Sequence, residues 1–324
     1  MSTNTNTSTK KSISIISPSF SEGTILIVFL ALFVLLSVAV NGFFTANNLS
    51  NLVRQTSING VIALGMTFVI VSAGIDLSVG SVVGFAGMFA AILMTQAGMN
   101  APLSVIIAII AGTLVGVING ILIYDGKVPP FIATLGTMTV FRGVIMLISG
   151  ARMVSGLPAS FLNLAQMSIL GMPSLFVIWV ITILISAFII SKTRFGRNIY
   201  AIGSNVEAAR LSGINIRTNM YMIYGYSALM SSIAGIMLVS RLANGIPTAG
   251  SGYELDAIAA AVIGGASLNG AEGSIVGTVV GAMLMSTLRN AGDLLGIDPF
   301  ILQILIGALI VAAVLIDQVK KQSK

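Results

Sequence analysis

Long apolar segments recur along almost the whole chain, and most charged residues fall between them. Only 8% of the 324 residues are charged, whereas soluble domains contain about 25%. A helix that crosses a membrane needs about 20 mainly apolar residues, and most of the segments approach that length. The sequence therefore predicts an all-α membrane protein with about ten transmembrane helices, some short or broken, at residues 24–40, 58–73, 79–97, 103–123, 131–149, 175–190, 220–239, 255–268, 274–290 and 300–316.

The positive charges predict which side of the membrane each end of the chain occupies, because cytoplasmic loops are enriched in Lys and Arg. Ten crossings from a cytoplasmic N-terminus leave Arg54, Arg152, Arg241 and Arg289 outside, with Arg142 inside a segment. The cytoplasmic side then holds the remaining bases, which are Lys10, Lys11, Lys127, Lys192, Arg194, Arg197, Arg210, Arg217, Lys320, Lys321 and Lys324. Both termini are therefore predicted to be cytoplasmic.

Composition divides the chain into three parts. Residues 1–23 are rich in Ser, Thr and Asn, which indicates a disordered cytoplasmic tail. Residues 24–317 form the transmembrane domain, with a charged cytoplasmic loop at 191–218, and residues 318–324 form a second cytoplasmic tail. A signal peptide is the alternative for the run at 24–40, but its length favours an uncleaved first span.

A Gly-rich stretch near the C-terminal end carries carboxylates at a depth where charge is expensive. Residues 253–281 hold Glu254, Asp256 and Glu272 among glycines and small apolar residues. Charge and irregular backbone are tolerated inside a membrane only where protein or a water-filled cavity surrounds them. The stretch therefore predicts part of a pathway through the membrane.

Two of the apolar segments, 58–73 and 255–268, are short and contain glycine, which is typical of broken or re-entrant helices. Residues 79–84 (VGSVVG) also match residues 276–281 (VGTVVG). The match favours a duplicated core, either parallel or, if one short segment is re-entrant, inverted. Glycines spaced by four within 103–123 predict close helix packing inside one subunit.

The residue types that are absent exclude several kinds of chemistry. The chain contains no Cys and no His, which excludes disulfides, thiolate or imidazole metal ligands, and Cys or His nucleophiles. No metal and no other cofactor is expected. The bases are not interleaved with aromatic residues, so no nucleic-acid partner is expected. The nearest match to a phosphate-binding loop, at 120–127, has the wrong spacing.

The charged loop at 191–218 contains the signals of a short helix. Ser204 or Asn205 is placed to cap it, Glu207 suits its first turn, and Gly213 is placed to end it. About two turns of helix do not persist alone in water, so the helix must pack against something. Two interpretations stay open, namely a helix lying on anionic lipid and a docking element for a cytoplasmic partner.

Several long motifs are more specific than the composition. They are SAGIDLSVGS at 72–81, FIATLGTMT at 131–139 followed by Arg142 and Gly143, EAARLSGI at 207–214, PTAGSGYELDAIAA at 247–260, and GGASL at 264–268. Together they resemble the monosaccharide and branched-chain amino acid permeases of ABC importers, and most of all the ribose permeases. The resemblance covers roughly residues 43–317. GGASL stands where ribose permeases usually have GGTSL, which keeps the identity of the sugar open.

The resemblance implies a multi-pass subunit of the bacterial cytoplasmic (inner) membrane that is a transporter and not an enzyme. Two copies would pair as a homodimer in the lipid bilayer. A separate cytoplasmic ABC ATPase subunit would hydrolyse ATP, and an extracytoplasmic sugar-binding protein would deliver the substrate, D-ribose. The alternatives are another monosaccharide, a furanose-like signal, or an ion-coupled transporter that relies on Asp76 and Asp256.

The resemblance also assigns roles to particular residues. The loop that contacts the ATPase would comprise Asn205, Glu207, Ala208, Ala209, Arg210 and Gly213. A neutral sugar needs hydrogen-bonding groups, which makes pathway candidates of Asn59, Asp76, Asn119, Thr134, Thr137, Tyr253 and Asp256. Asp76 is also placed to cap the helix that follows it, and the alternative roles are gating and making the turn rigid. Arg142 is expected to have a structural role, through a carbonyl contact or an ion pair with Asp76 or Asp256.

Overall fold

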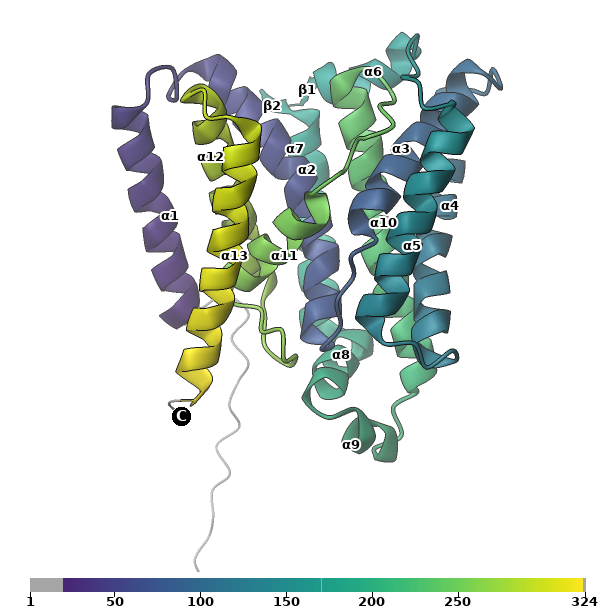
Figure 1. The fold of residues 1–324 in the computed structure, drawn as a ribbon, viewed down its shortest axis with the longest axis vertical. Coiled ribbons are helices and arrows are strands. Elements are labelled where there is room, and N and C mark those ends of the chain that lie inside the picture. The colour runs from purple at the N-terminus through teal and green to yellow at the C-terminus, as the bar shows by residue number, and fades with distance from the viewer. Residues whose placement is uncertain (1–19, 170, 323–324) are drawn as a thin grey trace, which may run out of the picture.

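The computed structural model describes residues 20–169 and 171–322, and within them the chain is almost entirely helical (Figure 1). The elements are α1 (Phe20–Ala39), α2 (Ala46–Val71), α3 (Val79–Thr95), α4 (Ala101–Tyr124), α5 (Pro130–Ser149), α6 (Ala159–Gln166), β1 (Ser168–Ile169), β2 (Met172–Pro173), α7 (Ser174–Lys192), α8 (Arg194–Ser204), α9 (Val206–Leu211), α10 (Ile216–Leu242), α11 (Tyr253–Ile263), α12 (Ile275–Leu294) and α13 (Pro299–Gln322). Each predicted apolar segment overlaps one of these helices. The predicted tail at 1–23 lies outside the described residues as far as residue 19, and helix α1 already begins at residue 20.

Five helices of the described region are long and apolar enough to cross a membrane, namely α2, α4, α5, α7 and α10. Shorter apolar helices lie beside them, including α3 and parts of α1 and α13. Helix α11 has only 11 residues, which at 1.5 Å per residue is about 16 Å, roughly half the hydrocarbon thickness of a bilayer. The predicted span at 255–268 therefore does not cross a membrane by itself.

The segment at 58–73 is not the short or broken helix that the sequence predicts. It belongs to α2, a continuous helix of 26 residues. The first turns of α2 are polar, so hydropathy alone missed them. Thr45 nevertheless starts the helix there, because its hydroxyl accepts a hydrogen bond from the backbone N–H of Asn48 at 3.3 Å.

The helix order repeats with reversed direction, as Figure 1 shows. Helix α2 descends, residues 72–78 return to the middle of the helical layer, and α3 begins there before α4 and α5. Helix α10 ascends, residues 243–252 drop back to the middle, and α11 begins there before α12 and α13. The repeat is therefore inverted and pairs α3 with α11. The match between 79–84 and 276–281 joins α3 to α12 instead, so it is not the structural repeat.

Helix α10 lies at the centre and packs against α2, α3 and α4. The glycines of α4 make this approach possible. A Cβ on Gly116 would lie 2.2 Å from the Tyr224 carbonyl oxygen, and one on Gly120 would lie 2.8 Å from the Tyr221 Cα. The spacing of four is thus used for packing within one chain, as the sequence predicts.

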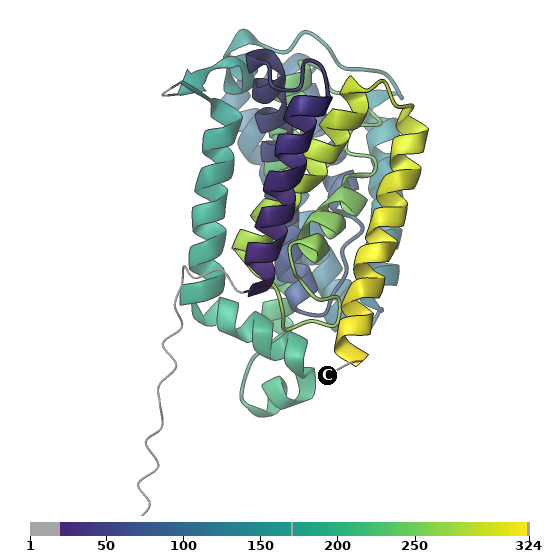
Figure 2. The same cartoon turned by 90° about the vertical axis from the view of Figure 1, so that its left-hand side faces the viewer.

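The two ends of the molecule differ in structure (Figures 1 and 2). Helices α8 and α9 lie at one end, and the start of α1 and the end of α13 lie toward the same end. Helix α6 and the β1–β2 hairpin, with Ile169 paired to Met172, lie at the opposite end. The described ends of the chain therefore share one side, and the cytoplasmic location of that side stays a prediction.

Candidate functional site

The short helix predicted in the charged loop is present as α9, at the tip of one end of the molecule (Figure 1). Asn205 caps it, since its Oδ1 accepts a hydrogen bond from the Ala208 backbone N–H at 2.9 Å. The helix ends before Gly213, whose φ of +82° suits glycine. Sequence signals therefore located both ends of this element.

The outer face of α9 combines paired charges with exposed apolar surface. Glu207 and Arg210 form an ion pair of 2.9 Å between Oε2 and Nη2, and their side chains are 68% and 60% exposed. Leu211, the last residue of the helix, is 79% exposed. Ala209 instead faces inward and packs in a small cluster with residues of α8 and α10. Exposed ion pairs add little to stability, so this pair contributes little to holding α9 in place.

A buried hydrogen-bond network begins at the turn between α2 and α3. Asp76 Oδ1 accepts hydrogen bonds from the Ser78 backbone N–H at 2.9 Å and the Ser78 hydroxyl at 2.6 Å. Its Oδ2 accepts one from the Ser227 hydroxyl of α10 at 3.0 Å. Asp76 does not cap α3, because the cap position falls on Ser78, which makes no side-chain cap bond. The carboxylate instead fixes the turn and joins it to α10.

The network continues into α4 and α5. Asn119 Nδ2 donates a hydrogen bond to the Ser78 hydroxyl at 2.9 Å, and the Thr137 hydroxyl donates one to Asn119 Oδ1 at 2.6 Å. The Thr134 hydroxyl reaches the Ile75 carbonyl at 3.4 Å. Asn119, Thr134 and Thr137 are all buried. The structure thus brings these predicted pathway residues together, in contacts that join helices of one subunit.

Sequence reasoning missed Ser78 and Ser227, which complete the network. The spacing of Asp76 and Ser78 was a usable signal, because an Asp commonly bonds the backbone two residues further on. Ser227 had no local signal, since it arrives from α10. Asn59 lies apart from the network on α2, where its Oδ1 is buried without a hydrogen-bond partner among the described residues.

A second group of predicted residues surrounds the start of α11. Asp256 is 2% exposed and accepts a hydrogen bond from Arg289 Nη2 at 2.6 Å. The predicted alternative of an ion pair between Arg142 and Asp76 or Asp256 is wrong, because Arg289 is the partner of Asp256 among the described residues. Helix α12 continues to Leu294 and carries Arg289 beside α11. Glu272 lies apart, exposed in the loop between α11 and α12.

Arg142 makes a carbonyl contact. Its Nη1 donates a hydrogen bond to the Ala249 carbonyl at 2.7 Å, in the chain that leads down to α11. Glu254 lies close enough to Arg142 to interact electrostatically. Glu254 Oε1 accepts a hydrogen bond from the Gly252 backbone N–H at 3.2 Å, while its Oε2 is buried without a hydrogen-bond partner among the described residues. Tyr253 precedes it and packs against the core. Charged and aromatic groups thus meet in the middle of the helical layer.

Glycines let two helices approach the segment around α11. A Cβ on Gly80 of α3 would lie 2.4 Å from the Gly250 carbonyl oxygen. A Cβ on Gly281 of α12 would lie 2.0 Å from the Ala260 carbonyl oxygen. Any larger residue at either position must displace backbone. The matching VGSVVG and VGTVVG sequences therefore each supply a glycine for close packing. Gly80 packs against the residues before α11, and Gly281 packs against α11 itself.

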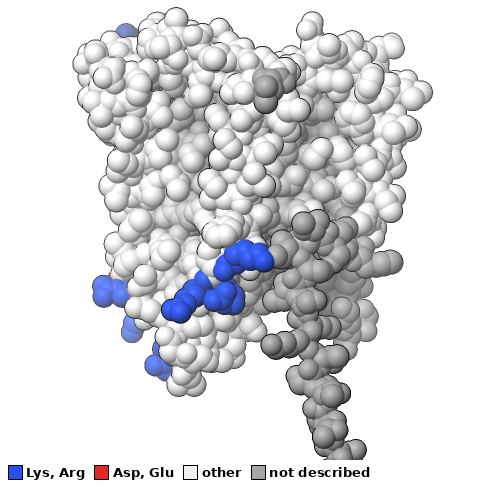
Figure 3. All heavy atoms as spheres, turned by 180° about the vertical axis from the view of Figure 1, so that it is seen from behind, with Lys and Arg blue, Asp and Glu red and all other residues white. Residues whose placement is uncertain are grey.

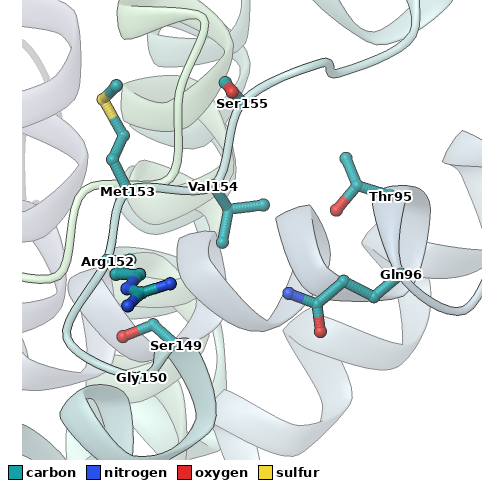
Figure 4. Close-up of a pocket in the computed structure, with 8 residues that line it drawn as sticks. All are labelled: Thr95, Gln96, Ser149, Gly150, Arg152, Met153, Val154 and Ser155. Carbon is teal, nitrogen blue, oxygen red and sulfur yellow. The ribbon is translucent and has the colours of Figure 1, made fainter.

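A polar hollow of about 660 Å³ opens between the C-terminal ends of α3 and α5, at the end of the molecule opposite α9. Figure 4 shows Arg152 and Ser149 on one side and Gln96 and Thr95 on the other. None of the predicted site residues lines it. The hollow therefore adds a polar surface that sequence reasoning did not find.

Known proteins resemble this chain over most of its length. The family of branched-chain amino acid transport system permease components matches residues 48–314. A ribose import permease protein of Bacillus subtilis (strain 168) is 43% identical over 297 residues, covering 90% of this chain and 92% of the relative. The ribose import permease protein of Escherichia coli (strain K12) is 42% identical over 301 residues, covering 92% and 93%.

A xylose transport system permease protein of Escherichia coli (strain K12) is 37% identical over 341 residues, covering 86% of this chain and 87% of the relative. No solved structure matches the chain. The residues that the family model matches include the turn before α3, α9 and α11. The chain is a member of the family of branched-chain amino acid transport system permease components.

Proposed function

We propose that this chain is the membrane-spanning permease subunit of an ABC sugar importer, and that its cargo is D-ribose. The observation that carries the proposal is the identity of 42–43% with ribose import permeases over about nine-tenths of the chain. The protein itself would hydrolyse nothing. It would pass a sugar, delivered by a binding protein, across the bacterial inner membrane while a separate ATPase subunit supplies the energy.

We infer that α9 is the element that contacts the ATPase. Its exposed Glu207–Arg210 pair and exposed Leu211 offer charge and apolar area at the tip of the molecule. Ala209 anchors the element to α8 and α10, so a push on α9 would be transmitted to α10. Asn205 and Gly213 would set the two ends of this contact, and Ala208 would lie within it.

The residues around α11 are the proposed lining of the pathway. Tyr253, Glu254 and Asp256 offer an aromatic ring and carboxylate oxygens, which suit the faces and hydroxyls of a sugar. Arg289 and Arg142 hold the neighbouring groups in place. The Asp76 network is enclosed within one subunit, and its proposed role is to keep the turn before α3 rigid.

The remaining partners follow from the same proposal. Two copies of the chain would form the pathway between them, with both termini in the cytoplasm. The hollow between α3 and α5 lies on the side where a binding protein would arrive. Residues 24–317 would act as one membrane domain.

Reconstitution tests the proposal directly. Proteoliposomes would hold this chain with its candidate ATPase, with the binding protein outside and ATP inside or omitted. We expect uptake of labelled ribose that requires ATP and both partners. Uptake that persists without ATP, or that collapses with an uncoupler while ATP is held constant, would refute the proposal.

Xylose is the second candidate cargo, because a xylose transport system permease is 37% identical to this chain. Competition separates the two sugars. We expect unlabelled ribose to suppress uptake at lower concentrations than xylose. If xylose suppressed uptake at lower concentrations than ribose, the protein would still be an ABC importer permease, but its cargo would be xylose.

A further inference from the structure

Two cavities of opposite character meet at the end of the molecule that carries α8 and α9. One, of about 500 Å³, is lined by Arg194, Arg197 and Asn198 of α8 and by polar residues that follow α9. The other, of about 560 Å³, runs between α4, α7 and α10 and is largely apolar. Phe195, Thr218 and Met222 line both cavities. The two therefore form one continuous groove with a basic end and an apolar end.

The basic end carries charge that the described part of the chain does not neutralise. Arg194 and Arg197 are exposed and lie on one face of α8, and none of the ion pairs of the described residues includes either of them. Asp125, at the end of α4, is engaged by Arg217 at 3.0 Å. Seen from behind, Lys and Arg side chains gather at this end, and the described part of that face shows no acidic side chain (Figure 3).

The apolar end has the position and length that an acyl chain requires. Val117 of α4, Ile189 of α7 and Leu229 of α10 line it. From Thr218 to Leu229, α10 rises about 16 Å at 1.5 Å per residue, which is roughly the depth of one leaflet. Neighbouring side chains of α4 and α7, such as Leu114 and Phe188, are exposed as expected of a lipid-facing surface.

We propose that this groove is a binding site for one anionic glycerophospholipid of the inner leaflet. The phosphate lies between Arg194 and Arg197, whose planar guanidinium groups match its geometry. One acyl chain lies along α10 between α4 and α7. The outward residues of α9, Glu207 and Leu211, do not line the groove. Gly213, at the end of the proposed ATPase contact, does line the basic cavity, so the two sites adjoin each other. The assignment to the inner leaflet rests on the proposed cytoplasmic location of this end.

The absence of cysteine in the sequence makes a site-specific test possible. Met222→Cys, at the junction of the two cavities, would carry a fluorophore in the full chain reconstituted in phosphatidylcholine bilayers. Phosphatidylglycerol with a spin label on its acyl chain would then be compared with spin-labelled phosphatidylcholine. We expect stronger quenching by the anionic lipid at equal amounts.

The charge variant is Arg194→Gln with Arg197→Gln, and the matched control is Arg210→Gln on the neighbouring helix. Each basic residue near a membrane surface contributes about a fivefold factor to the binding of anionic lipid, so the double variant should lose roughly thirtyfold in selectivity. The control should keep it, because the charge of Arg210 is already offset by its ion pair with Glu207. These residues are exposed, so the variants retain the core that folds the chain.

Four results would overturn the proposal. Equal quenching by both lipids would mean that the groove meets only bulk lipid. An equal loss in Arg210→Gln would mean that the surface charge acts without a site. Disulfide formation between two copies of Met222→Cys, without selective quenching, would mean that a second copy of the chain covers the groove. Competition by free glycerol phosphate would also overturn it, because the pocket would then bind a soluble anion.

Discussion

The ion pair between Asp256 and Arg289 provides the sharpest test of how α11 is held inside the helical layer. Asp256 is 2% exposed and the Arg289 side chain is 27% exposed, and they meet at 2.6 Å. Arg289→Met keeps most of the side-chain volume and removes the charge. The carboxylate of Asp256 is then left buried without its cation, which is far more costly than losing an exposed pair.

The size of the effect follows from this geometry. Removing one partner of a buried ion pair destabilises a protein by about 3–5 kcal/mol. Arg289 retains some contact with solvent, so we expect the lower end, about 3 kcal/mol. For a chain of this length each kcal/mol lowers the melting temperature by about 2 °C, so Arg289→Met should melt about 6 °C below the parent. Adding Asp256→Asn removes the orphaned charge and should restore more than half of the loss.

Trp179 makes the assay simple, because it is the only tryptophan in the chain. It is 4% exposed and packs against Gly60 of α2, so its emission reports the loss of helix packing. Thermal melts of purified protein in bilayer discs would be compared with those of Arg152→Met, which changes an exposed arginine in the loop after α5. A melting temperature for Arg289→Met within about a degree of the parent would refute the reasoning. A double variant as unstable as Arg289→Met would mean that lost packing, and not the orphaned charge, is the cause.

Three other predictions concern the docking helix, the packing and the buried network. Glu207→Ala and Gly213→Val should insert normally but uncouple ATP hydrolysis from uptake in the reconstituted system, and normal uptake by both would remove the docking assignment. Gly116→Ala should lower the melting temperature by several degrees, because its Cβ would lie 2.2 Å from a carbonyl oxygen, whereas Gly136→Ala meets open space and should be neutral or slightly stabilising. Asp76→Ala leaves its buried donors without an acceptor and should cost about 2–4 kcal/mol in a thermal or denaturant melt; an unchanged melt would contradict the network.

Hydropathy located the helices but not the residues at which they begin and end. The apolar run at 255–268 continues past Ile263, yet α11 ends there because Gly264 and Gly265 follow, the latter with a φ of +94°. The opposite error occurred at α2, whose polar first turns are helical because they are capped and packed. Both errors arise because hydropathy reflects the average composition of a segment, whereas the ends of a helix depend on single residues and their neighbours.

The candidate site was predictable in its residues but not in its pairs. Asn205 and Gly213 act through local rules, so the sequence located α9 almost to the residue. Asp256 was recognised as a buried charge, but its partner was not, because Arg289 lies on the following helix and becomes a neighbour only through the turn between them. Contacts between elements depend on topology, which no local pattern in this chain encodes.

The inverted arrangement gives a physical reason to expect an uncharged cargo. Helices α3 and α11 both begin in the middle of the layer, where a helix N-terminus is a binding site for anions. In this chain both N-termini already have carboxylates of their own. Asp76 lies in the turn before α3, and Glu254 and Asp256 lie in the first turn of α11.

An amino acid carboxylate arriving at either helix would meet a position that is already occupied by negative charge, whereas a sugar would meet hydrogen-bond acceptors. We therefore expect that excess leucine does not compete with ribose uptake by the reconstituted importer. Glu254→Gln would remove one negative charge from the first turn of α11. We therefore expect leucine to compete with ribose better in this variant than in the parent protein. Inhibition of the parent protein by leucine would show that these carboxylates do not exclude anionic cargo.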